Sequence, residues 1–186
     1  MKIVGISVKM KIVGISVKNI LINNIKELYE SAFPSDERRE FGEFKQIMTE
    51  NEHFHVYAFL EDDHFAGFIT FWEWDEFCYG EHFAVLPEMR NGGKGSIYLQ
   101  GITKKLGKPV VLEVEPPTDE MAIRRIGFYE RNGFKLWKDI TYIQPPYDKT
   151  KSSIELKLMT IGDIVFDGNN DKKIKRIKSE VYNFHE

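Results

Sequence analysis

Three glycines and two cations lie close together in the segment 90–96, Arg-Asn-Gly-Gly-Lys-Gly-Ser. An apolar segment with the pattern of a strand (77–85) precedes it, and apolar residues at helical spacing (97–106) follow it. Glycines let backbone N–H groups approach an anion closely, and the first turn of a helix adds unpaired donors and a partial positive charge. Arg90 and Lys94 add full charges. The segment therefore favours binding of a phosphate-containing ligand.

Two common phosphate-binding motifs do not fit this loop. A P-loop needs Ser or Thr directly after its Lys, whereas Lys94 is followed by Gly95. A Rossmann fingerprint, counted from Gly93 and Gly95, needs a third glycine where Tyr98 stands. Two alternatives remain, a different class of phosphate-binding loop or a tight strand-to-helix turn whose charges are solvated.

Carboxylates lie on two segments that read as strands. In 109–115, alternation places Glu113 and Glu115 with Val111 on one face and three apolar residues on the other. Central strands of α/β sheets are usually apolar throughout, so these carboxylates need water, partners or a cleft. In 77–85, alternation predicts that the side chain of Glu81 lies on the same face as those of Tyr79, Phe83 and Val85.

A second motif follows the glycine loop. The loop fits Arg-x-x-Gly-x-Gly through Arg90, Gly93 and Gly95, and a predicted helix farther along the chain ends in Tyr-x-x-x-Gly-Phe, Tyr129 to Phe134. Two motifs in this order are much more specific than one. Together they resemble the signatures of the GNAT superfamily, the acyl-CoA-dependent N-acetyltransferases. The resemblance covers roughly 11–160.

The resemblance implies a fold of the α/β (α+β) class. It implies a mixed, mostly antiparallel central sheet that is splayed between two adjacent parallel strands and flanked by helices. Acyl-CoA would enter the gap between those two strands. Backbone groups at the end of the strand 77–85 would face the pantetheine arm, and one N–H there would polarise the thioester carbonyl.

The resemblance also implies roles for single residues. Tyr129 would protonate the departing thiolate, and the alternative is a buried tyrosine bonded to backbone. The stretch Leu-Glu-Val resembles the ribosomal-protein alanine acetyltransferases, which implies that Glu113 is the general base. A carboxylate paired with an arginine is the alternative. Glu81 is the competing base and Glu115 the third candidate.

The donor site that the resemblance implies has two parts, and Arg125 is a further candidate for it. The ledge for acyl-CoA would consist of Phe83, Ala84 and Val85, and the pyrophosphate site of Arg90, Asn91, Gly92, Gly93, Lys94, Gly95 and Ser96. Many members carry Asn and Ala where this chain has Ala122 and Arg125. Arg125 either contacts phosphate in place of that Asn or lies on the solvated helix surface.

The remaining pattern predicts the other elements. Helices are expected at 19–33, 37–49 and 118–132, strands at 54–60, 65–74, 134–143 and 153–159, and a basic amphipathic helix at 172–182. That basic helix is expected to dock one face on the domain. Trp74 and Tyr79 are weak candidates for the acceptor pocket, because such aromatic residues more often belong to the core.

The chain begins with a repeat, because MKIVGISVK at 1–9 recurs at 10–18. We interpret 1–9 as a duplicated segment, 10–160 as the acetyltransferase domain, and 161–186 as an extension that carries the basic helix. The second copy is expected to supply the first strand, since it joins the following chain directly. The first copy would extend an edge or pair with a neighbouring molecule, so a homodimer is left open.

Composition sets the outer bounds. The chain has 186 residues, a net charge of −3 and one cysteine, Cys78. These values exclude an internal disulfide and a multi-cysteine metal site, and they give no support to nucleic-acid binding. No apolar run reaches membrane-spanning length. We expect a cytoplasmic protein without membrane or nucleic-acid partners and without a metal.

The expected function is transfer of an acetyl group from acetyl-CoA to a primary amine by direct attack, with a small molecule or a peptide as acceptor. The first alternative is an acyl-CoA-binding module of the same fold without turnover. The second is a nucleotide-binding protein, which the two failed motifs disfavour. The sequence does not identify the amine.

Overall fold

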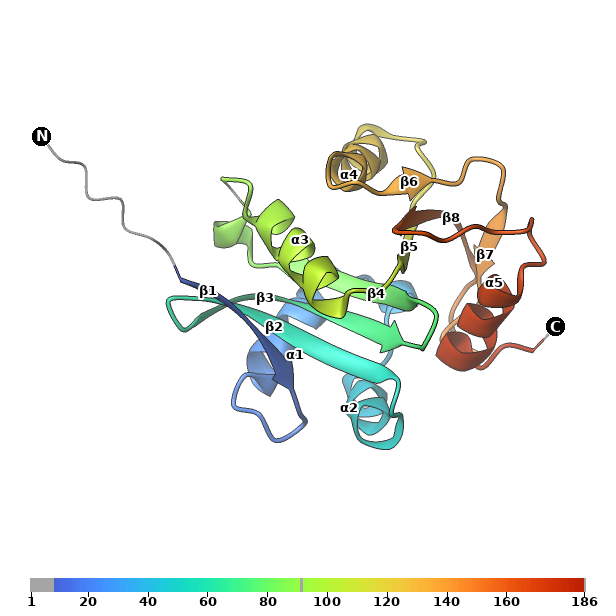
Figure 1. Cartoon of the computed structure of the whole chain (residues 1–186). Coiled ribbons are helices and arrows are strands. Elements are labelled where there is room, and N and C mark those ends of the chain that lie inside the picture. The colour runs from blue at the N-terminus through green and yellow to red at the C-terminus, as the bar shows by residue number, and fades with distance from the viewer. Residues whose placement is uncertain (1–8, 91, 186) are drawn as a thin grey trace, which may run out of the picture.

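A computed structural model describes residues 9–90 and 92–185 (Figure 1). Its strands are β1 Met10–Ile15, β2 Phe54–Glu61, β3 His64–Glu73, β4 Cys78–Val85, β5 Val110–Val114, β6 Lys135–Leu136, β7 Tyr142–Gln144 and β8 Ile154–Ile161. Its α-helices are α1 Ile22–Ala32, α2 Phe41–Glu50, α3 Lys94–Leu106, α4 Glu120–Arg131 and α5 Lys172–Arg176, and a π-helical turn, Ile177–Val181, continues α5. Most of the predicted elements exist with ends moved by a few residues.

The strands of the described residues form one mixed sheet in the order β1-β2-β3-β4-β5-β8-β6, with β7 also paired to β8. Neighbours are antiparallel except for the parallel pair of β4 and β5. This confirms the predicted class of fold. The second copy of the repeat supplies β1, whereas the first copy lies outside the described residues apart from Lys9.

β4 and β5 pair along only part of their lengths. The register runs from Cys78 opposite Val110 to Gly80 opposite Leu112, although both strands continue beyond it. Past that point the strands separate, and Figure 1 shows the halves of the sheet diverging there. The separation leaves backbone groups of both strands without sheet partners, so a ligand can bind between them.

Helices cover both faces of the sheet. α1 and α2 pack with the C-terminal segment in one core cluster, through residues such as Tyr29, Phe44 and Ile177. α3 and α4 pack on the other face, through residues such as Leu99 and Ile126. In Figure 1, α3 lies on one side of β1 to β4 and the pair α1 and α2 on the other.

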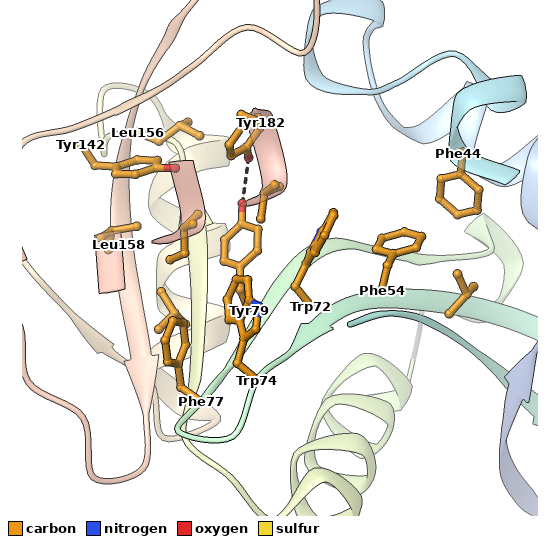
Figure 2. Packing of buried hydrophobic residues seen from close by; sticks show 14 of the residues in the cluster. Phe44, Phe54, Trp72, Trp74, Phe77, Tyr79, Tyr142, Leu156, Leu158 and Tyr182 are labelled. Atoms are coloured by element: carbon orange, nitrogen blue, oxygen red, sulfur yellow. Dashed lines mark hydrogen bonds between the residues drawn. The ribbon is translucent and has the colours of Figure 1, made fainter. Parts of the chain in front are cut away.

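The C-terminal segment docks through its apolar side, as its periodicity predicts. Ile174, Ile177, Val181 and Tyr182 are buried in the same cluster as α1 and α2. Figure 2 shows Tyr182 from this segment facing Tyr79 of β4 inside that cluster. The segment therefore belongs to the core that surrounds the cleft.

Two sequence expectations are wrong. A continuous strand was expected at 134–143, but β6 and β7 are separate short strands. After Trp137, whose backbone N–H still donates to Leu158 of β8 at 3.0 Å, residues 138–141 leave the ladder while β8 continues. The expected shared face of β4 is also wrong, because Thr70 pairs with His82 and Phe71 with Gly80, so that Glu81 is an extra residue. Such a β-bulge reverses the side-chain alternation beyond it.

The bulge decides where the β4 side chains lie. Glu81 and His82 both face the α1 and α2 side, where they contact Trp72 and Tyr29 respectively. Phe83 then turns to the opposite side and packs against Phe59 and Phe128. Two polar side chains thus lie next to one another on the side of the sheet that α1 and α2 cover.

Candidate active site

A cleft of about 540 Å³ opens where β4 and β5 separate. The cleft is lined by the four candidates for catalysis, Glu81, Glu113, Glu115 and Tyr129. It is also lined by the end of β4, Phe83 to Val85, and by the two candidate arginines, Arg90 and Arg125. A smaller cavity of about 40 Å³ lies in the strand gap and is lined by Glu113, His82 and Tyr129 among others. The structure thus brings together at one cleft the four candidates for catalysis that the sequence placed on separate elements.

Glu113 of β5 points to the side of the C-terminal segment. The Tyr182 hydroxyl donates a hydrogen bond to its Oε2 at 3.0 Å, and Oε1 is buried without a hydrogen-bond partner in the described residues. Burial raises the pKa of Glu113 to about 7, while the facing hydroxyls of Tyr142, Tyr79 and Tyr182 oppose that rise. Glu113 can therefore gain or lose a proton near neutral pH.

Glu81 is held very differently. Its side chain is fully buried and forms an ion pair with Arg39. Trp72 Nε1 donates to Oε2 at 2.8 Å, and the Tyr147 hydroxyl donates to Oε1 at 2.9 Å. Burial alone would raise the pKa of Glu81, but Arg39 holds it below its ordinary value. Both oxygens are thus engaged, so that Glu81 has little freedom to take up a proton.

Arg39 connects several parts of the fold that the sequence does not link. Besides Glu81, it donates to the backbone oxygen of Val181, and its guanidinium lies 4.6 Å from the ring centre of Tyr147. The backbone N–H of Arg39 donates to the hydroxyl of Tyr29 at 2.9 Å. Sequence reasoning missed this residue, because nothing local marks an arginine that will be buried.

Tyr129 lies near the end of α4 and lines both the cleft and the strand gap. Phe128 and Phe134 pack against its ring at centroid distances of 5.2 and 5.6 Å. Burial raises the pKa of Tyr129 to about 12, with Arg125 opposing the rise. The hydroxyl therefore keeps its proton at any working pH and can donate it to a group in the gap.

The glycine loop leads directly into α3. Gly92 and Gly93 have φ of +76° and +74°, a conformation that favours glycine, and a Cβ on either would meet nothing within 4 Å. Arg90 Nε donates to the oxygen of Val85 at 2.9 Å, which ties the loop to the end of β4. Asn91 lies outside the described residues. Helix α3 begins at Lys94, directly after these glycines, so that its first turn can offer backbone N–H groups to an anion.

Lys94, which was expected to add a full charge to the loop, is paired with a carboxylate of the protein. It forms an ion pair with Glu61 of β2, whose other oxygen accepts a 2.5 Å hydrogen bond from Tyr98. Since Lys94 points toward β2, Arg90 is the more available cation of the loop. Ser96 accepts a hydrogen bond from Nδ2 of Asn132 at 3.0 Å.

Asn132 links the end of α4 to α3, and no sequence pattern marked it as part of the site. It is buried at the end of α4, where its Nδ2 also donates to the oxygen of Phe128 at 2.8 Å and its Oδ1 accepts from Gln100 of α3 at 3.0 Å. It therefore fixes α3 and the glycine loop to the helix of Tyr129. The sequence signal for Asn132 was its place directly before a glycine at the end of a helix. In the structure that glycine, Gly133, has a φ of +89°.

The remaining candidates, Arg125, Trp74 and Tyr79, differ in how far they are buried. Arg125 forms an ion pair with Glu115 at the mouth of the cleft, and each side chain is about half exposed. Trp74 is 1% exposed, and its Nε1 donates to Glu180 at 2.6 Å. Tyr79 is equally buried and lies behind Glu113, next to Tyr182. These two aromatic residues belong to the core, as Figure 2 shows.

The residues present fit an acyl-CoA ligand. Unpaired strand backbone at the gap suits the pantetheine arm, and the open glycine loop with Arg90 suits a pyrophosphate. In residues 9–90 and 92–185, no group of three or more metal-binding side chains converges. No helix in the same part of the chain is long and apolar enough to span a membrane.

Comparison with known proteins agrees with this geometry. Residues 22–134 match the sequence profile of the Acetyltransferase (GNAT) family. A solved structure from Bacteroides thetaiotaomicron, provisionally named a GNAT acetyltransferase, is 36% identical with a TM-score of 0.89, over 94% of this chain and 99% of that one. YjbC of Bacillus subtilis (strain 168), also a provisionally named acetyltransferase, is 29% identical, and the match spans only 64% of this chain and 60% of that protein.

A more distant structure carries the proposed type of ligand. A GNAT family acetyltransferase from Elizabethkingia anophelis, solved with acetyl-CoA bound, shares 15% identity and a TM-score of 0.56, over 82% of this chain and 97% of that one. At this identity the likeness concerns the fold alone. From the family profile, the close structural relative and the geometry of the cleft, the chain belongs to the GNAT family of acetyltransferases.

Proposed function

We propose that the protein transfers the acetyl group of acetyl-CoA to a primary amine by direct attack. One observation carries the proposal: Glu113, whose pKa lies at about 7, and the protonated hydroxyl of Tyr129 line the same cleft at the strand gap. A proton acceptor and a proton donor at one cleft are what aminolysis of a thioester needs.

The donor would lie along the end of β4. Backbone groups of Phe83, Ala84 and Val85 would hold the pantetheine arm, and one of their N–H groups would stabilise the oxyanion. The pyrophosphate would lie on the loop from Arg90 to Ser96, with Arg125 facing it from α4. Acetyl-CoA supplies the activated acyl group, and the chain supplies position and proton transfer.

The chemical step balances within these residues. Glu113 takes a proton from the substrate ammonium, and the free amine attacks the thioester carbonyl, so that a C–N bond forms. The C–S bond then breaks as Tyr129 donates its proton to the departing sulfur, and the second proton that the amine nitrogen loses passes to the Tyr129 oxygen. Glu113 afterwards returns its proton to solvent. The products are an N-acetyl amide and CoA, and no covalent acyl-enzyme is needed.

Glu113 suits the role of base better than the two other carboxylates. Glu81 is paired with Arg39 and has both oxygens engaged, while Glu115 is paired with Arg125. Oε1 of Glu113 is the only carboxylate oxygen among the buried, unpartnered side-chain atoms of the described residues. Among the described residues no arginine or lysine forms an ion pair with Glu113, so that its charge is not already neutralised.

Release of CoA from acetyl-CoA in the presence of a panel of primary amines tests the proposal. We expect turnover with at least one class of amine, in which the formation of N-acetyl product matches CoA release. The alternative of a binding module without turnover predicts binding of acetyl-CoA, measured by calorimetry, with no release above the hydrolysis background for any amine. Absence of both binding and release would contradict both functions.

A further inference from the structure

One ring nitrogen of His82 has no hydrogen-bond partner in the part of the chain that the structure describes. Its Nε2 lies 2.9 Å from the backbone oxygen of Glu37, and because a carbonyl can only accept, Nε2 carries the proton. Nδ1 is therefore an acceptor, and it is buried without a hydrogen-bond partner in the described residues. The residue is 3% exposed and lines the cleft. A donor group on a ligand is the partner that this atom lacks.

Aromatic neighbours fix the ring of His82 in this orientation. Tyr29 and Phe33 contact it edge-on at centroid distances of 4.9 and 4.7 Å, and Tyr147 lies parallel to it at 6.2 Å. Burial lowers the pKa of His82, so the ring stays neutral and Nδ1 keeps its lone pair. The acceptor is thus held in place before any ligand binds.

Carboxylates line the cleft beside His82. Glu37 and Glu113 line the cleft on this side, and among the described residues no basic side chain forms an ion pair with either one. Three cations lie nearby. Arg39 pairs with Glu81, and Arg125 pairs with Glu115 while it faces Glu37. Arg38 also acts on His82, and its Nε donates to the backbone oxygen of Phe33 at 3.1 Å. Burial raises the pKa of Glu37, which a bound cation would reverse.

We propose that Glu37 and Nδ1 of His82 form a subsite for a second amino group, so that the preferred acceptor is a diamine whose reacting amine lies at Glu113. An ammonium has three N–H donors, which Nδ1 of His82 and the Glu37 carboxylate can share. The rings of Phe33 and Tyr147 line the same space and favour a cation. This proposal rests on the proposed function, since it names the substrate class of the same site.

The experiment compares two acceptors of the same length, 1,4-diaminobutane and 1-aminobutane. We expect kcat/KM to favour the diamine by about tenfold or more, the scale of one charge-assisted hydrogen bond. In Glu37→Gln and in His82→Phe this ratio should fall toward one. The control Glu43→Gln, an exposed carboxylate in the first turn of α2, should keep the wild-type ratio. A wild-type ratio near one, or a ratio that Glu37→Gln leaves unchanged, would overturn the subsite.

Calorimetry separates failure of the subsite from failure of the proposed function. 1,4-Diaminobutane is titrated into wild type and Glu37→Gln, both saturated with CoA. Binding that Glu37→Gln weakens by about tenfold supports the subsite even if no amine is acetylated, in which case only the proposed function fails. If amines are turned over but the diamine binds no better than 1-aminobutane, the proposed function stands and the subsite is wrong.

Discussion

The hydroxyl of Tyr182 donates a hydrogen bond to Oε2 of Glu113 at 3.0 Å, across 69 residues of sequence. The hydroxyl of Tyr79 lies 2.8 Å from that of Tyr182, so that a chain of two phenols ends on the carboxylate (Figure 2). The hydrogen bond from Tyr182 lowers the pKa of Glu113, which burial raises. The last turn of the chain therefore helps to set the protonation of the proposed base.

Tyr182→Phe should shift the acidic limb of the pH profile of kcat/KM to higher pH. Loss of this hydrogen bond removes a group that favours the charged carboxylate, so the pKa of Glu113 should rise above about 7. Initial rates between pH 5 and 9 measure the shift. Tyr57→Phe is the control, because its hydroxyl donates to Glu73 at 2.6 Å and neither residue lines the cleft. A limb that moves to lower pH would contradict the assignment.

Glu113→Gln should reduce kcat/KM by about 10²-fold or more, the usual scale of general-base catalysis. Glutamine has a similar size and can still accept the hydrogen bond of Tyr182, but it cannot take up a proton. The limb near pH 7 should disappear from the residual activity. An unchanged limb in this variant would assign the titration to another group.

The same substitution should stabilise the protein at alkaline pH. The folded-state pKa of Glu113, about 7, lies above the ordinary 4.5, so the folded state holds this proton more tightly than the unfolded chain. That contribution is fully present below pH 4.5 and is lost as the pH rises through 7. Glu113→Gln should thus gain up to about 3 kcal/mol over wild type at pH 8 and less at pH 5. Thermal unfolding at the two pH values measures the difference.

Glu81→Gln should destabilise the fold by about 3–5 kcal/mol, because it leaves the charge of Arg39 buried without its counter-ion. The double variant Arg39→Met/Glu81→Leu should lose less stability than the sum of the single variants, since neither charge then remains. Denaturant unfolding tests both statements. A Glu81→Gln protein with wild-type stability but without turnover would instead make Glu81 the base.

The sequence predicted those parts of the site that depend on local pattern. The glycine loop and the helix of Tyr129 follow from turn chemistry and from apolar spacing, both of which are local. The face of Glu113 also follows, because β5 alternates regularly. The bulge at Glu81 could not be predicted, since alternation assumes an unbroken ladder. The contact of Tyr182 with Glu113 depends on tertiary packing across much of the chain, for which no short-range signal exists.

Tyr129→Phe should lower kcat by about 10²-fold and leave the affinity for CoA nearly unchanged. The hydroxyl is expected to act only as the C–S bond breaks, whereas the ring, with its contacts to Phe128 and Phe134, remains in the variant. Steady-state rates and calorimetry with CoA measure the two effects. A thioester with a more acidic thiol needs less help from a proton donor, so that an aryl thioester accepted by the site should lose much less rate in Tyr129→Phe. An equal loss with both thioesters would mean that Tyr129 positions the donor and does not protonate its sulfur.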